Sequence, residues 1–342
     1  MSANPHILEL RTSPHVHGPN SVQTIMSNVM FALLPIAAFA VFLFGISALA
    51  LICTTTTVCV VTESLVCKLS KKESTLGDYS AAITGLLLAL TLPPGMPLWM
   101  AAVGSVVSVC VGKALFGGLG QNAFNPVLVG LAFIHAAFPI EVSSWTLPLA
   151  EGRFTSFMGT TLTVPFLSPA AFDGITGATP LALQKFEHVT TGLGELFLGT
   201  TAGCTGETSD ALILLCGAYL IARKFINWRI PASTLGSAFL TSLVFYAADP
   251  EKYPSPFFTL FAGGLILGAI FLASDMVTSP VTPLGMWVYG GLIGFLTVII
   301  RLFSGQLEGV MYAILLGNAV SPIIDSLTQP RIFGARRAKA KL

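Results

Sequence analysis

Segment 173–181 carries residue types that suit the binding of an anion. It reads Asp-Gly-Ile-Thr-Gly-Ala-Thr-Pro-Leu. Gly174 and Gly177 permit tight turns whose backbone N–H groups can face an anion, and Thr176 and Thr179 add two hydroxyl groups. Taken alone, the pattern is a weak indication of a phosphate cradle. An ordinary turn rich in glycine and threonine is the simpler interpretation.

Two amide side chains, Asn122 and Asn125, lie in segment 120–126 near the start of an apolar run. Amide groups at membrane depth are costly unless they are paired. One interpretation is a contact to a ligand or an ion. The other is a structural clamp in which the amides join two helix ends by hydrogen bonds. The residues themselves leave both interpretations open.

Three acidic residues, Glu63, Asp275 and Asp325, stand close to apolar runs. Carboxylates inside a membrane are candidates for ion or proton handling. Each of these also lies near an expected helix end, where it could be solvated or could cap the helix. Arg301 lies at another expected helix end, from which its long side chain can reach the membrane interface.

The six cysteines indicate no metal or cluster site. They form no CxxC pair and lack the spacing of zinc or iron–sulfur ligands. Most lie within apolar runs, where a cysteine usually behaves as a small hydrophobic residue. The sequence also lacks a basic patch interleaved with aromatic residues, so nucleic acid is not expected as a partner.

Composition identifies the class of protein. Of the 342 residues, 54% are hydrophobic and 10% are charged, whereas ordinary soluble domains contain roughly 25% charged residues. Segment 80–139 holds Lys113 as its one lysine or arginine and has no carboxylate. The segment is long enough for about three membrane helices. Because backbone groups at membrane depth must be bonded internally, the expected fold is an all-α integral membrane protein.

Apolar runs predict about ten transmembrane helices. They occupy segments 24–44, 46–67, 80–95, 97–115, 122–139, 210–224, 231–248, 256–274, 284–303 and 307–327. With the N-terminus in the cytoplasm, 13 of the 17 lysines and arginines fall on the inner side, as the positive-inside rule requires. Both termini are therefore expected in the cytoplasm, and segment 140–209 becomes one long periplasmic loop.

The two halves of the chain show related strings. Segment 120–126, Gly-Gln-Asn-Ala-Phe-Asn-Pro, is similar to Gly-Asn-Ala-Val-Ser-Pro at 317–322. Five helices in each half predict repeats that are inverted across the membrane, although short strings of this kind also recur by chance. The expected units are a first half at 1–139, the loop at 140–209, a second half at 210–330 and a basic cytoplasmic tail at 331–342.

Over most of its length the chain resembles the D-type membrane proteins of the Rnf (or Rsx) ion-translocating oxidoreductase complex. More distantly it resembles the B-type proteins of the sodium-pumping NADH:quinone reductase. The strings that carry the resemblance are Ser-Pro-His at 13–15, segment 80–89 with Pro93 and Pro94, segment 117–126, segment 173–181, Trp-Arg-Ile-Pro at 228–231, Asp-Met-Val-Thr at 275–278, and Pro-Ile-Ile-Asp at 322–325 with Pro330 and Arg331. One departure is Met276, where proline is usual.

The resemblance implies a covalent flavin. In that family the second threonine of an [S/T]-x-A-T motif carries FMN through a phosphoester, and the matching residue here is Thr179. The residues expected around the cofactor are Asp173, Gly174, Thr176, Gly177 and Ala178, with Asn122 and Asn125 as further candidates. A separate flavin transferase would attach the FMN. The resemblance also implies a second, noncovalent flavin, riboflavin, within the bundle.

The function implied is electron transfer between NADH and ferredoxin coupled to Na⁺ or H⁺ translocation across the bacterial inner membrane. The chain has neither a nucleotide fingerprint nor cluster ligands, so it is expected to act only as one component of the complex. Its expected partners are the NADH-oxidising, iron–sulfur and second flavin subunits, within membrane lipid. The alternatives are a B-type component of a sodium-pumping NADH:quinone reductase and a stand-alone channel or secondary transporter.

Overall fold

The computed structural model describes residues 21–71, 75–157, 160–165, 178–187, 189–199, 201–207 and 209–330. Within these ranges the chain is all-helical and forms no β-strand. The long helices are α1 (Val22–Phe44), α2 (Ile46–Leu69), α4 (Leu98–Cys110), α10 (Arg229–Ala248), α13 (Pro283–Phe303) and α14 (Val310–Thr328). Shorter apolar helices are α3 (Ser80–Thr91), α5 (Pro126–Ala137) and α9 (Asp210–Ala222).

The remaining helices are short. They are α6 (Pro139–Val142), α7 (Pro180–Ala182), η3 (Leu183–Glu187), α8 (Leu193–Leu198), α11 (Pro256–Phe261), α12 (Leu265–Leu267) and η4 (Gly268–Leu272), with single turns η1 (Leu76–Asp78) and η2 (Ala114–Phe116). Three of these, α11, α12 and η4, together occupy one predicted apolar run that Gly263 interrupts.

All ten predicted apolar runs are helical, which confirms the all-α class. Six helices within the described residues are long and apolar enough to cross a membrane. For α4 this span includes the turns that follow the helix, up to Phe116. Helices α3, α5 and α9 have 12, 12 and 13 residues, fewer than the roughly 20 that a full crossing needs. Helix length therefore supports a multi-pass membrane protein, and the count of ten crossings stays a prediction.

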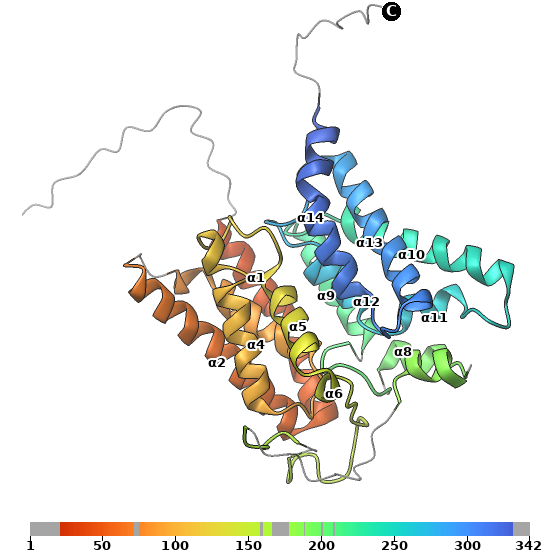
Figure 1. Cartoon of the computed structure of the whole chain (residues 1–342), viewed down its shortest axis with the longest axis horizontal. Coiled ribbons are helices and arrows are strands. Elements are labelled where there is room, and N and C mark those ends of the chain that lie inside the picture. The colour runs from red at the N-terminus through yellow and green to blue at the C-terminus, as the bar shows by residue number, and fades with distance from the viewer. Residues whose placement is uncertain are drawn as a thin grey trace, which may run out of the picture.

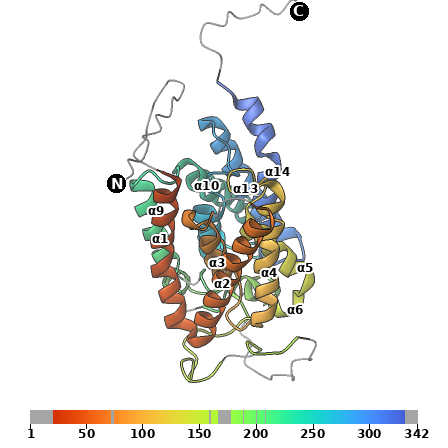
Figure 2. The ribbon, with the colours of Figure 1, turned by 90° about the vertical axis from the view of Figure 1, so that its left-hand side faces the viewer.

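The two halves pack as two adjoining groups of helices, α1–α5 on one side and α9–α14 on the other (Figure 1). Helices α1 and α9 lie side by side where the groups meet (Figure 2), and Tyr219 Oη donates to Asn28 Oδ1 at 2.8 Å across them. In the first half α4 packs on α2 and α5, and in the second half α13 packs on α10 and α14. The predicted repeat would produce matching neighbours of this kind.

Small residues set the distance between the helices of the second half. A Cβ atom on Gly290 would come within 1.8 Å of Ser233 Oγ, and one on Gly294 within 2.1 Å of the Thr234 carbonyl oxygen. Helices α13 and α10 therefore approach through glycine, serine and threonine. Membrane helices often associate in this way, because apolar burial alone does not drive them together in lipid.

The described parts of segment 140–209 lie towards the end of the bundle opposite to the start of α1 and the end of α14 (Figure 1). Its described parts include α6, α7, η3 and α8. It is tied to the helices by backbone bonds, since Thr205 N donates to Leu92 O at 2.9 Å and Gly206 N donates to Leu90 O at 2.8 Å. This long connection is therefore attached to the end of α3.

Candidate functional site

Thr179 is a buried residue at the start of α7. It is 5% exposed, and its Oγ1 accepts a hydrogen bond from Ala182 N at 3.2 Å. This N-cap bond uses the hydroxyl oxygen as an acceptor. Ala178, beside it, is exposed. The other predicted residues of the motif, Asp173, Gly174, Thr176 and Gly177, lie outside the described residues.

Thr179 and three connecting segments together line a cavity. Its lining includes Thr179, Gly203, Glu207, Gly263 and Glu308. These residues come from the start of α7, the segment before α9, the break between α11 and α12, and the segment between α13 and α14. The fold thus brings Glu207 of the long connection and Glu308 of the second half to the same cavity as the predicted flavin threonine.

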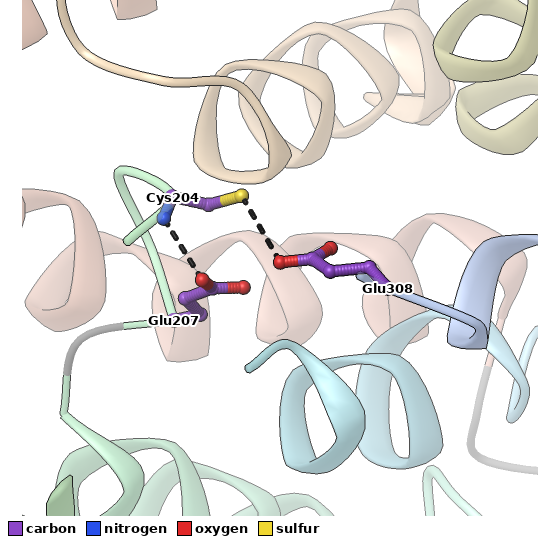
Figure 3. A group of neighbouring side chains, drawn as sticks. All are labelled: Cys204, Glu207 and Glu308. Carbon is purple, nitrogen blue, oxygen red and sulfur yellow. Dashed lines mark hydrogen bonds between the residues drawn. The ribbon is translucent and has the colours of Figure 1, made fainter. Parts of the chain in front are cut away.

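Cys204, Glu207 and Glu308 form one polar group in this region (Figure 3). Cys204 N donates to Glu207 Oε1 at 2.9 Å, and Cys204 Sγ donates to Glu308 Oε1 at 3.9 Å. The thiol and the two carboxyl groups have ligand atoms within 4.8 Å of one another. These are residue types that could hold a metal ion, although the sequence had predicted no metal site.

Burial determines the protonation of this group. Burial raises the pKa of the Glu207 carboxyl above its usual value, and it raises the pKa of Glu308 well above, with the charge of Glu207 adding to the effect. The Cys204 thiol also has a pKa well above its usual range, because it is buried and faces both carboxyls. The group is therefore favoured in its neutral, protonated form when nothing else balances its charge.

The motifs of the sequence point to neither Glu207 nor Glu308. The available signal was that each carboxylate lies next to or within the edge of an apolar run, Glu207 near the end of segment 140–209 and Glu308 at the start of the run 307–327. Their meeting depends on the packing of segments about a hundred positions apart, which no local pattern reveals.

Arg301, in the last turn of α13, lies close to this group. Its side chain is 6% exposed, and Nη1 donates to the Thr259 carbonyl at 2.8 Å. The other two nitrogens, Nε and Nη2, have no hydrogen-bond partner among the described residues. The expectation that Arg301 reaches the membrane interface is wrong, because the space that Gly263 leaves open lets the guanidinium turn inward.

A second cavity lies between the two halves. Its lining includes Ser80, Lys113, Asn122, Asn125 and Asp275. Asn125 caps α5 by accepting from Val127 N at 3.0 Å, and its Nδ2 donates to Leu272 O at 3.1 Å across the interface between the halves. For Asn125 the structure thus contains the clamp that the sequence offered as one of two interpretations.

Asn122 differs from Asn125. Its Nδ2 donates to Phe124 O at 3.1 Å, but its Oδ1 has no partner among the described residues although the side chain is 5% exposed. A buried amide oxygen without a partner is unusual. Because Asn122 lines the cavity, it is a candidate for contact with a ligand there.

The three acidic residues singled out near apolar runs have different surroundings. Glu63 is buried and its Oε1 lies 2.6 Å from Lys113 Nζ. Asp325 accepts from Val281 N at 3.1 Å and Thr282 N at 3.4 Å, so it caps the segment that enters α13. Asp275 lines the second cavity and accepts from Thr278 Oγ1 at 3.3 Å.

Comparison with known proteins places these features in a family. A model described as the NQR2, RnfD, RnfE family matches residues 9–334. The chain is 41% identical over 342 residues to the D-type component of a complex of Clostridium ljungdahlii named "Proton-translocating ferredoxin:NAD(+) oxidoreductase", covering 97% of this chain and 98% of that one. It is 39% identical to the corresponding component of the "Na(+)-translocating ferredoxin:NAD(+) oxidoreductase" complex of Acetobacterium woodii, covering 97% of each.

A third relative is the D-type component of the complex named "Ion-translocating oxidoreductase" in Halorhodospira halophila. It is 36% identical over 349 residues, and the match covers 98% of each chain. The similarity therefore extends along the whole chain and is not confined to a single motif.

Proposed function

The chain belongs to the NQR2, RnfD, RnfE family, and from this premise we propose that it carries electrons through FMN joined to Thr179 by a phosphoester. It is a membrane subunit of an Rnf-type ion-translocating ferredoxin:NAD⁺ oxidoreductase complex, and it works as part of that translocase. The channel or secondary transporter considered from the sequence loses its support, because the named relatives are components of redox complexes.

The observation that carries the proposal is the setting of Thr179. Its oxygen accepts the capping bond from Ala182 N, so its O–H bond can be replaced by an O–P bond while the oxygen remains an acceptor. The side chain borders a cavity, and Arg301 nearby has two unpartnered donor nitrogens among the described residues. These features fit an attached phosphate. Bound FMN would supply one-electron transfer, and the protein would supply its placement.

A noncovalent riboflavin is proposed for the second cavity. Support comes from Asn122 Oδ1, which is unpartnered within the described ranges and could accept a hydrogen bond from a ring N–H group. Apolar residues such as Leu87 and Phe271 also line the cavity, and sites for small molecules are usually lined by apolar side chains with a few polar groups. Asn125 would then shape the cavity through its bond to Leu272 O.

The proposed topology has ten crossings, with both termini in the cytoplasm of a bacterial inner membrane. The start of α1 and the end of α14 lie at one end of the bundle, and the segment with Thr179 lies towards the other (Figure 1). With 13 of the 17 lysines and arginines assigned to the inner side, the flavin segment would face the periplasm. The flavin transferase would then act on that face.

Electrons would reach and leave this subunit through partners. The sequence has no nucleotide fingerprint and no cluster-ligand spacing, so NADH oxidation and iron–sulfur transfer would belong to other components of the complex. The coupled cation is left open between H⁺ and Na⁺, because relatives of nearly equal identity are named for each.

Flavin fluorescence in a denaturing gel tests the proposal. The wild-type chain and Thr179→Val would each be produced with the flavin transferase and the partner proteins. We expect a fluorescent band for the wild type and none for the variant, because a phosphoester survives denaturation whereas noncovalent binding does not. A non-fluorescent wild-type band would contradict covalent attachment.

A further inference from the structure

Arg301 poses a problem of charge balance. A buried guanidinium that lacks a partner is costly, because it loses hydration without a compensating bond. The carboxyls of Glu308, Glu207 and Asp210 are close enough to act on its charge. Nevertheless, Nε and Nη2 are bonded to none of them among the described residues. The buried donors are thus free for another acceptor.

The free donors have a particular geometry. Nη1 is occupied by the Thr259 carbonyl at 2.8 Å, which fixes one side of the planar group. Nε and Nη2 lie on a single edge of the guanidinium and point the same way. This edge makes paired hydrogen bonds to two oxygens of one carboxylate or phosphate group.

The edge also lies near the segment that carries Thr179. Gly263 has φ of +71° and lines the cavity of Thr179. A Cβ atom placed on Gly263 would lie 2.7 Å from Leu181 Cδ1 and 3.0 Å from Arg301 Nη2. The guanidinium and the side chain two positions after Thr179 therefore both pack closely against Gly263.

We propose that Arg301 binds the phosphodiester of the flavin on Thr179 through its Nε and Nη2 edge, an inference that rests on the function proposed above. A phosphodiester carries one negative charge, which a single guanidinium balances. Arg301 is thus a positioning residue for the cofactor and takes no part in electron transfer itself. Gly263, which has no side chain, lets Arg301 and the segment of Thr179 approach one another.

The neighbouring acidic residues are compatible with an anion when they are protonated. In their neutral forms Glu207 and Glu308 do not repel a phosphodiester. Their O–H groups can also donate hydrogen bonds. The alternative is a metal ion bound by Cys204 and the ionised carboxylates of Glu207 and Glu308. The two arrangements predict different effects of replacing Glu308.

The test compares Arg301→Gln and Arg301→Lys with the wild type in the assembled, detergent-purified complex. The first readout is the initial rate at which the flavin transferase labels the chain, measured by in-gel fluorescence. The second is the ³¹P resonance of the attached phosphodiester. We expect Arg301→Gln to slow labelling about tenfold, as loss of a charge-assisted pair implies, and both variants to shift the resonance.

Arg301→Lys distinguishes loss of phosphate binding from a failure to fold, because lysine keeps the buried charge but lacks the edge with two donors. We expect it to restore part of the labelling rate while the ³¹P resonance remains shifted. Lys252→Gln is the control, since it removes an exposed cation and should change neither readout. Wild-type labelling and an unchanged resonance in both Arg301 variants would overturn the inference.

Two further outcomes separate the possible errors. If the wild type carries no covalent flavin, or keeps it in Thr179→Val, the proposed function fails before Arg301 is in question. Glu207→Gln and Glu308→Gln should keep the flavin and its resonance, because glutamine mimics the neutral acid. A different result would overturn the assignment to Arg301: the wild type holds one metal ion per chain, and Glu308→Gln loses both this ion and flavin labelling.

Discussion

Glu63 and Lys113 form an ion pair inside the bundle, with 2.6 Å between Oε1 and Nζ and with both side chains 5% exposed. Lys113 Nζ also donates to Ser80 Oγ at 2.5 Å, and Thr75 Oγ1 donates to Glu63 Oε1 at 2.5 Å. The pair joins the end of α2 to the turn after α4 and the start of α3. It therefore fixes three helix ends relative to one another.

Removing one partner of this pair should be more harmful than removing both. Lys113→Met leaves the Glu63 carboxylate buried without its cation, which typically costs about 3–5 kcal/mol. We expect a large fall in the thermal unfolding temperature of the purified complex. The double variant Glu63→Gln/Lys113→Met should recover much of it. Equal unfolding temperatures for the single and double variants would contradict this prediction.

The protonated carboxyls near Thr179 predict a dependence of stability on pH. The pKa of Glu308 is raised in the folded protein, so the folded state holds a proton that the unfolded state has lost above roughly pH 4.3. Stability should therefore fall as pH rises from that value towards the folded pKa. Thermal unfolding measured from pH 5 to about 8 should show this slope, and Glu308→Gln should reduce it. A slope unchanged in the variant would contradict the assignment.

Asn122 and Asn125 should respond differently to substitution by alanine. Asn125→Ala removes a helix cap and the bond to Leu272 O, so we expect a loss of about 1–2 kcal/mol of stability. Asn122→Ala removes only the bond to Phe124 O and should change stability little. If riboflavin occupies the cavity, Asn122→Ala should lower the flavin released by denaturation. Chromatography of that extract and thermal unfolding measure the two effects separately.

The close approach of α13 and α10 gives a matched pair of variants. Gly290→Ala would place a Cβ atom 1.8 Å from Ser233 Oγ, whereas Gly291→Ala meets nothing within 4 Å. We expect Gly290→Ala to cost about 1–3 kcal/mol through overpacking and Gly291→Ala to be neutral or slightly stabilising. Thermal unfolding of the two variants compares them directly. Similar values for both would mean that the helices can move apart without cost.

Much of the fold follows from the sequence, because hydropathy alone identifies where helices form in a membrane protein. The runs predicted at 24–44 and 284–303 correspond to α1 (Val22–Phe44) and α13 (Pro283–Phe303) almost residue for residue. The run at 256–274 was also found, but it is broken into α11, α12 and η4. Hydropathy cannot detect such a break, because Gly263 accommodates side chains that arrive from other parts of the chain.

The candidate site was predicted less completely for the same reason. Thr179 as the flavin residue rests on the family resemblance and stays a prediction, whereas Asn125 makes the hydrogen bonds of the clamp interpretation. Arg301 was placed at the membrane interface, and the contact of Glu207 with Glu308 was not foreseen. Each of these depends on which segments meet in three dimensions, and that information is absent from local composition and spacing.

The most direct test of the account is to locate the flavin by mass spectrometry on peptides of the wild-type complex. We expect FMN joined by a phosphoester to Thr179, absent from Thr179→Val and retained in Thr176→Val. An unmodified Thr179 peptide from a complex that carries covalent flavin on this chain would contradict it.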